Sequence, residues 1–150
     1  MSINKFEHLF LKGEYPERGK LLSGLTLQQV NEVPKGLSHS IYEELWHLTT
    51  WQDVVISNDE SKFKSWENKN IFPTAKAADI NEWNDLVKKF MDDVKKIFEY
   101  TSVPGNLEQE IEPGFTINDT LSSLAVHNAV HFGKILAIRQ AIGAWPPEEK

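Results

Sequence analysis

The sequence predicts an all-α protein folded as one four-helix bundle. Three long segments carry apolar residues at alternating spacings of three and four, the pattern of helices that bury one face in a core. A length of 150 residues suits a single domain, because a chain of this size buries roughly two-thirds of the surface that it exposes when unfolded. We therefore expect residues 1–150 to form one helical-bundle domain.

The N-terminal part of the chain predicts a short helix over residues 3–12. Gly13 and Pro16 end this helix, since glycine and proline are the strongest local breakers of regular structure. A brief helical turn is expected over 26–32, before Pro34 interrupts the chain again.

A capped helix is predicted over 40–58. Ser40 is followed three residues later by Glu43, which is the capping-box pattern: each side chain accepts a hydrogen bond from the other residue's backbone N–H. The apolar face of this helix comprises Ile41, Leu45, Leu48 and Val55, with Trp51 alongside. His47 lies at the edge of that face, about 100° around the helix from Leu48.

A second long helix is predicted over 80–100. Its apolar face comprises Ile80, Trp83, Leu86, Val87, Phe90, Met91, Val94, Ile97 and Phe98. Its other side carries charged residues, which we expect to be solvated: Lys88, Lys89, Asp92, Asp93, Lys95 and Lys96.

The last helix is predicted over 117–142, and polar residues interrupt its apolar seam. The seam comprises Ile117, Leu121, Leu124, Ile135, Ile138 and Ile142. Asn128 and His131 occupy the seam positions between Leu124 and Ile135. A buried polar group without a partner costs roughly 1–3 kcal/mol, so these groups need partners, and a metal ion is one candidate.

Two histidines of this helix, His127 and His131, stand four residues apart and therefore on one face, with their Cβ atoms roughly 6 Å apart. Catalytic zinc centres usually take three protein ligands and a water, so a third ligand is needed. His47 is the best candidate, and His8 and His39 are weaker ones. The alternative is that the histidines are partly exposed or hydrogen-bonded residues at the border of the core.

Two motifs in these helices match a known family pattern. The first reads Ser40-Ile-Tyr-Glu-Glu-Leu-Trp-His47-Leu-Thr-Thr-Trp51, and the second reads His127-Asn-Ala-Val-His131-Phe-Gly133-Lys-Ile135, with Arg139 after it. Phe72-Pro73 then precedes an amphipathic helix that contains Trp83. From about Gly24 onward the chain resembles the DinB-like (damage-inducible) superfamily of small metal-binding helical bundles. Lys134 replaces a commoner glutamine and Val130 a frequent aromatic residue, and neither change removes a proposed ligand.

The resemblance implies an up-down-down-up bundle with a long crossover between its second and third helices. The link over 59–79 has about twenty residues, which at ~3.3 Å each suffices to cross the ~30 Å length of a helix. The helices over 40–58 and 80–100 can therefore run parallel. Length alone also allows a simple array of helical hairpins. The link over 101–115 suits an antiparallel return.

The resemblance also implies that His47, His127 and His131 hold one divalent metal ion. Imidazole suits zinc, nickel, iron or copper, so the ligands do not name the metal. We expect zinc or nickel, with iron or manganese as alternatives. Glu44 and Asn128 are positional candidates to accept the second N–H of these histidines, although either side chain is otherwise simply solvated or packed.

No catalytic residue is assigned. Tyr42 and Trp51 are candidates to line a pocket, and Lys134 to contact a substrate anion. For Trp51 the plainer interpretation is core packing, and for Lys134 it is a solvated side chain beside the core.

Relatives in the superfamily include enzymes that transfer low-molecular-weight thiols, such as bacillithiol and mycothiol, to electrophiles, and metal-dependent hydrolases or isomerases. The first hypothesis is therefore a metal-dependent thiol S-transferase that acts on small electrophiles with a small-molecule thiol cosubstrate. The alternatives are a non-catalytic metal-binding bundle, a metal-dependent hydrolase, and an empty site whose histidines are structural. The family's name also suggests a role in stress responses.

The composition argues against several partners. A net charge of −6 without a basic block gives no reason to expect nucleic acid, and the lack of cysteine excludes disulfides and thiolate ligands. No apolar run approaches the ~20 residues of a membrane span and no signal-peptide pattern opens the chain, so we expect a cytoplasmic protein without a membrane partner. A homodimer is suggested by Trp145, just past the last helix; the alternative is that Trp145 folds back onto its own chain.

Overall fold

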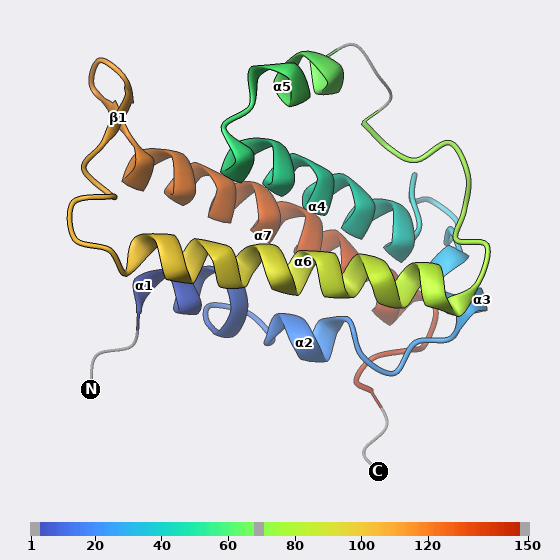
Figure 1. Cartoon of the computed structure of the whole chain (residues 1–150). Helices are drawn as coiled ribbons and strands as arrows, with labels where there is room; N and C mark the ends of the chain where they lie inside the picture. The colour runs from blue at the N-terminus through green and yellow to red at the C-terminus, as the bar shows by residue number, and fades with distance from the viewer. Residues whose placement is uncertain (1–3, 68–70, 148–150) are drawn as a thin grey trace.

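Three long helices dominate the protein, and the expected all-α class is confirmed. The computed structural model describes residues 4–67 and 71–147. The long helices are α4 (Ile41–Ser57), α6 (Ile80–Thr101) and α7 (Ile117–Ala141), and α4 packs against both of the others. Figure 1 shows that α4 and α6 run in the same direction, whereas α7 runs in the opposite one. The bounds predicted from the sequence for these three helices agree with the structure to within one residue at each end.

Capping boxes explain why the ends of two long helices are so well defined. At the start of α4, the Glu43 N–H donates to Ser40 Oγ at 3.1 Å, and the Ser40 N–H donates to Glu43 Oε1 at 3.0 Å. At the start of α7, Thr116 and Asp119 form the same reciprocal pair. Each box satisfies backbone N–H groups that the first helical turn leaves without a carbonyl partner.

The N-terminal region is less regular than predicted. It consists of α1 (Lys5–Glu7), the π-helical turn η1 (His8–Lys12) and α2 (Arg18–Leu21), followed by α3 (Leu27–Asn31). The expected single helix over 3–12 is thus two short pieces, and Ile3 lies outside the described residues. The Gly13 N–H donates to the His8 carbonyl, five residues back, and the His8 ring occupies the space of a Gly13 Cβ. Only glycine permits this close approach.

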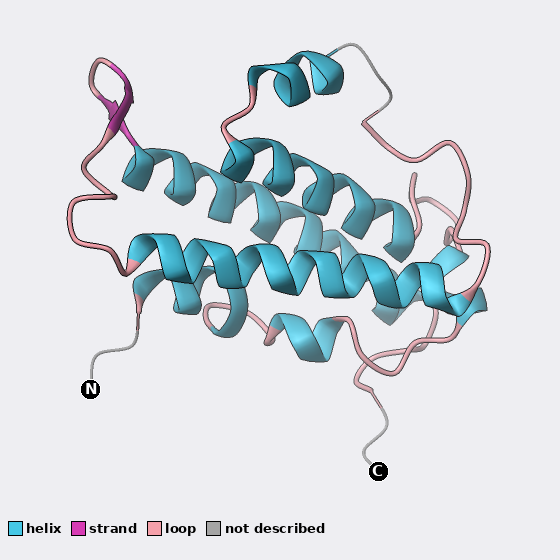
Figure 2. Cartoon of the chain, in the orientation of Figure 1, coloured by secondary structure: helices cyan, strands magenta, loops and turns pink. Residues whose placement is uncertain are grey.

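The two long links contain structure that periodicity did not indicate. The link over 59–79 begins with α5 (Glu60–Glu67), and the link over 101–115 contains β1 (Glu110–Glu112), which pairs with β2 (Phe115–Thr116) in an antiparallel hairpin (Figure 2). Gly114 has a φ of 82° in the hairpin turn, a conformation that favours glycine. Among the described residues, every helix is too short or too polar to cross a bilayer.

The core lies between the long helices and under the N-terminal segment. Most of the predicted apolar positions are buried, including Phe90 and Val94 of α6 and Leu124 and Ile135 of α7. Two expectations for α6 are wrong: Ile80, predicted on the apolar face, is 39% exposed, and Asp93, predicted on the solvated face, is 0% exposed. Ile80 is the first residue of the helix, where its side chain lies beyond the core. Asp93 is buried instead. Its carboxylate lies 2.9 Å from Lys89 Nζ, and this opposite charge makes its burial tolerable.

The buried Arg139 connects the last helix to the N-terminal segment and to the residues that follow the helix. Arg139 of α7 donates hydrogen bonds to the carbonyls of Leu21 and Ser23 at 2.9 and 2.7 Å and to that of Ala144 at 2.9 Å. Trp145 packs against the core, with its ring 5.4 Å from the Arg139 guanidinium. The side chain that suggested a homodimer thus folds back onto its own chain.

Candidate metal site

The structure brings the three proposed ligands together between α4 and α7. His47 projects from α4, and His127 and His131 from one face of α7. One ring nitrogen of each lies within 4.8 Å of those of the other two. His47 and His131 are buried, at 5% and 7% exposure, and His127 is partly buried. Residues eighty positions apart thus meet because α7 packs against α4.

The outer nitrogens of two ligands are held by hydrogen bonds. His131 Nδ1 lies 2.6 Å from Glu44 Oε2, and Glu44 is only 2% exposed. His47 Nδ1 lies 2.8 Å from the Ile71 carbonyl oxygen. A carbonyl and a carboxylate accept, so each Nδ1 carries the proton and donates it. The lone pairs of both rings are therefore on Nε2, the tautomer that outer partners impose on metal-binding histidines.

The inner nitrogens have a spacing that fits a metal ion. His47 Nε2 and His127 Nε2 are 3.2 Å apart. Two nitrogens bound to one tetrahedral zinc at ~2.05 Å would lie about 3.3 Å apart. Three imidazole donors also suit a borderline divalent ion. The residues present fit the metal that the sequence implies.

The surroundings keep the imidazoles of His47 and His127 neutral. Burial, together with the neighbouring His131 and His47, lowers the pKa of His127 to about 4. Burial also lowers the pKa of His47, although its hydrogen bond to Ile71 opposes the decrease. Lys134, expected near the site, is exposed and contributes a small repulsion to His47. A metal ion therefore finds lone pairs at neutral pH without displacing protons from these two rings.

Aromatic side chains cover one side of the cluster. The Phe72 ring stacks between His47 and His39, with centroid distances of 4.6 and 3.7 Å. Trp51 meets His127 edge-on at 6.2 Å, and Trp66 of α5 lies 5.2 Å from both Trp51 and His47. Trp51 therefore borders the site, as considered from the sequence, whereas Trp66 was not anticipated.

The other sequence candidates lie at different distances from the cluster. His39 contacts it only indirectly, with Nδ1 3.6 Å from Glu44 Oε1. His8 is paired with Glu14 at 2.9 Å, away from the cluster. Tyr42 is buried, and its hydroxyl donates to a Glu82 carboxylate oxygen at 2.9 Å. Tyr42 is thus engaged with α6 rather than open to a pocket.

Asn128 interacts with His127, whose pKa its side chain raises, and it also joins the helices behind the site. Its amide donates to Gln52 Oε1 at 2.9 Å, and the Gln52 amide donates to the Phe90 carbonyl at 3.3 Å. Gln52 was missed from the sequence, although a signal existed. It occupies the seam position between Leu48 and Val55, as Asn128 does in α7. Two polar residues in facing seams can satisfy part of each other's hydrogen-bonding capacity.

The comparisons with known proteins agree with the motifs. The family model of the DinB superfamily matches residues 19–135, more than three-quarters of the chain. No curated protein and no solved structure matched. The matched region contains all three histidines of the cluster, the whole of α4, most of α7 and the Glu44 carboxylate. The chain therefore belongs to the DinB superfamily.

Proposed function

We propose that this protein binds one divalent metal ion through His47, His127 and His131 and leaves at least one coordination position open. The observation that carries the proposal is the convergence of three ring nitrogens, with two Nε2 atoms 3.2 Å apart. The hydrogen bonds of Glu44 and Ile71 to the outer nitrogens support it, because they orient the rings before the ion arrives. Zinc or nickel is the proposed metal, with iron or manganese as alternatives.

The proposed activity is a metal-dependent transfer of a small-molecule thiol to a small electrophile. A divalent ion in this site would lower the pKa of a thiol or water that joins it, and so supply a nucleophile near neutral pH. In the transfer, the thiol proton is released, the sulfur bonds to the electrophilic carbon, and the leaving group departs with its electron pair. The protein contains no cysteine, so the sulfur comes from the cosubstrate.

A non-catalytic metal-binding bundle is the second candidate, and the burial of His47 and His131 favours it. Catalytic centres need room for a substrate, whereas structural sites are closed. A metal-dependent hydrolase is a further alternative, in which water takes the place of the thiol.

Two measurements separate these candidates. Elemental analysis of the purified protein is expected to give one equivalent of metal. A protein that still contains no metal after incubation with zinc or nickel would refute the metal site. The zinc- and nickel-loaded protein is then assayed for thiol consumption with a panel of electrophiles, beside His127→Ala. Equal rates in the two proteins would exclude metal-dependent transfer for that panel and leave the binding function standing.

We also infer that α1, η1 and α2 together serve as the first helix of an up-down-down-up four-helix bundle. The parallel course of α4 and α6 and the reversed course of α7 support this assignment (Figure 1). The long link with α5 is then the crossover that permits two consecutive long helices to run in the same direction.

A homodimer through the outer face of α7 is proposed as the quaternary state. Val126 and Val130 are 66% and 53% exposed on that face, and Gly133 leaves room for a second helix. A monomeric mass by light scattering at micromolar concentration would refute it. A cytoplasmic location, a role in stress responses and the absence of nucleic-acid and membrane partners stay predictions.

A further inference from the structure

One cavity of the protein lies away from the histidines. It has a volume of about 700 Å³ and opens where the last turns of α4 and α6 meet the first turns of α7 and the β1 strand. None of the three histidines lines it, and Asp53, on its wall, lies six residues beyond His47, roughly 9 Å along the helix. The volume falls in the range of small-molecule sites.

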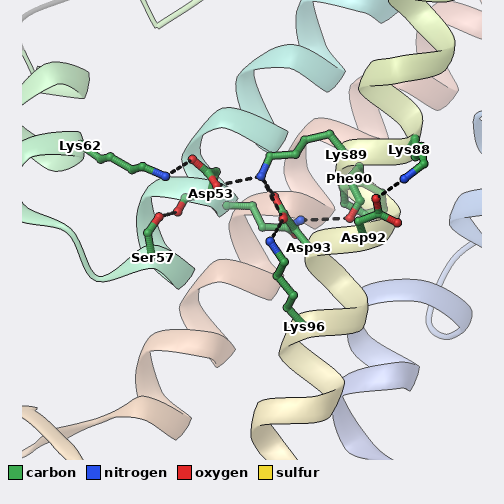
Figure 3. Close-up of polar contacts among 10 residues, drawn as sticks. Asp53, Ser57, Lys62, Lys88, Lys89, Phe90, Asp92, Asp93 and Lys96 are labelled. Carbon is green, nitrogen blue, oxygen red and sulfur yellow. Dashed lines mark hydrogen bonds and ion pairs between the residues drawn. The ribbon is translucent and has the colours of Figure 1, made fainter.

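A chain of alternating charges links three residues of the cavity lining, Asp53, Lys62 and Lys96 (Figure 3). Asp53 accepts from Lys62 at 3.0 Å through one oxygen and from Lys89 at 2.9 Å through the other. Lys89 also contacts the buried Asp93 at 2.9 Å, and Lys96 lies 3.5 Å from Asp93. The chain therefore begins and ends with a lysine, and both terminal lysines, Lys62 and Lys96, line the cavity.

The balance of this chain leaves one positive charge in surplus. Burial raises the pKa of Asp53, but hydrogen bonds from Lys89 and Lys62 outweigh it, and the pKa lies below its ordinary value. Burial lowers the pKa of Lys89, but the hydrogen bonds from Lys89 to Asp53 and Asp93 have the larger, opposite effect. The pKa of Lys89 is therefore raised above its ordinary value. Three lysine cations thus share two aspartates, and both oxygens of Asp53 are already engaged.

The rest of the lining is mainly apolar, with a few hydrogen-bonding groups. Its apolar residues are Val55, Ile56, Ile97, Ile111, Ile117 and Leu121. Thr120 Oγ1 is buried in this wall and has no hydrogen-bond partner among the described residues. Glu110 is the remaining charged group of the lining; it is exposed on β1 and forms no ion pair with Lys62 or Lys96 among the described residues.

We propose that this cavity binds a small amphipathic anion, with its apolar body against the isoleucines and its carboxylate or sulfonate between Lys62 and Lys96. An anion there places a negative charge beside each of the two lysines that end the chain of charges. The apolar walls of the cavity remove the body of the anion from water. This cavity is separate from the histidine cluster, so evidence against anion binding here would not count against the proposed metal function, nor the reverse.

The test uses two dyes with nearly the same apolar body. Anilinonaphthalene sulfonate carries an anionic group, and phenylnaphthylamine is its neutral counterpart. The wild-type protein is expected to bind both, and the double variant Lys62→Gln/Lys96→Gln to bind the sulfonate about tenfold more weakly, with the neutral dye changed by less than about twofold. Lys88→Gln removes an exposed lysine of α6 that is paired with Asp92 outside the cavity, and is the matched control.

Isoleucine methyl spectra locate the bound sulfonate. The methyl signals of Ile56, Ile97 and Ile117 are expected to shift, whereas those of Ile41 and Ile135, buried elsewhere in the core, are not. The same shifts are expected in His127→Ala, which separates this site from the metal site. Equal sulfonate affinity in the wild type and the double lysine variant, or methyl shifts outside the cavity only, would overturn the proposal.

Discussion

Replacing Glu44 is the sharpest test of how the histidine cluster is built. The Glu44 carboxylate is buried and accepts the Nδ1–H of His131 at 2.6 Å. The substitution Glu44→Gln keeps the volume of the side chain and an oxygen that can still accept this hydrogen bond. It removes the negative charge that strengthens the bond and makes His131 Nε2 a better donor to a metal ion.

The expected loss of metal affinity depends on which part of the Glu44–His131 interaction each variant removes. Losing an outer partner of a metal-binding histidine typically costs 10- to 100-fold in metal affinity, or about 1.4–2.7 kcal/mol. Glu44→Gln retains a neutral hydrogen bond, so we expect about a tenfold loss, at the lower end of that range. Glu44→Ala leaves a buried N–H unpaired and the ring free to turn, so we expect about a 100-fold loss.

The assay is zinc competition against a chromophoric chelator at constant pH and ionic strength. Glu43→Gln is the matched control, because it removes the same charge one residue earlier in the helix. Its capping box should survive, since Gln29 completes the same box with Thr26 at the start of α3. We expect Glu43→Gln to change affinity by less than about threefold. Equal affinities for the Glu43 and Glu44 variants would refute the claim that Glu44 orients His131.

Three further outcomes are expected. His131→Ala should abolish metal retention by elemental analysis while helix content by circular dichroism survives, because the apolar seams of three long helices form a core of their own; cooperative unfolding on chelation would contradict this. In the metal-free protein, the free energy of unfolding should fall by about 1–2 kcal/mol as the pH drops from about 6.5 toward 4. The lowered pKa of His127 means that the unfolded chain takes up the proton at a higher pH than the folded one, and the partial exposure of His127 keeps the loss below the ~3 kcal/mol of the full shift. A urea titration that is flat over this range would be inconsistent with a neutral, partly buried His127. Arg139→Met should lower the free energy of unfolding by about 3 kcal/mol, because the carbonyls of Leu21, Ser23 and Ala144 lose their donor; a loss below about 1 kcal/mol in denaturant unfolding would show that water replaces the guanidinium.

The helices and one pair of histidines were predictable because their signals are local. Ser40 with Glu43 marks a helix start through bonds that span three residues, and seam spacing reports which side of a helix faces the core. His127 and His131 share a face of α7 by helical geometry alone. His47 is different, since nothing local relates it to the pair, and the family resemblance was needed to join them.

The sequence by itself determined where the long helices run, which faces of them are apolar and which side chains can act as ligands, because these properties depend on neighbours within a few residues. Only the tertiary structure decided that Glu44 holds His131, that Gln52 pairs with Asn128, and that Asp93 is buried. Each of these depends on how one helix is rotated against another, which sets contacts between residues far apart in the chain. A partner across such an interface leaves no periodic trace in either segment, so packing alone selects it.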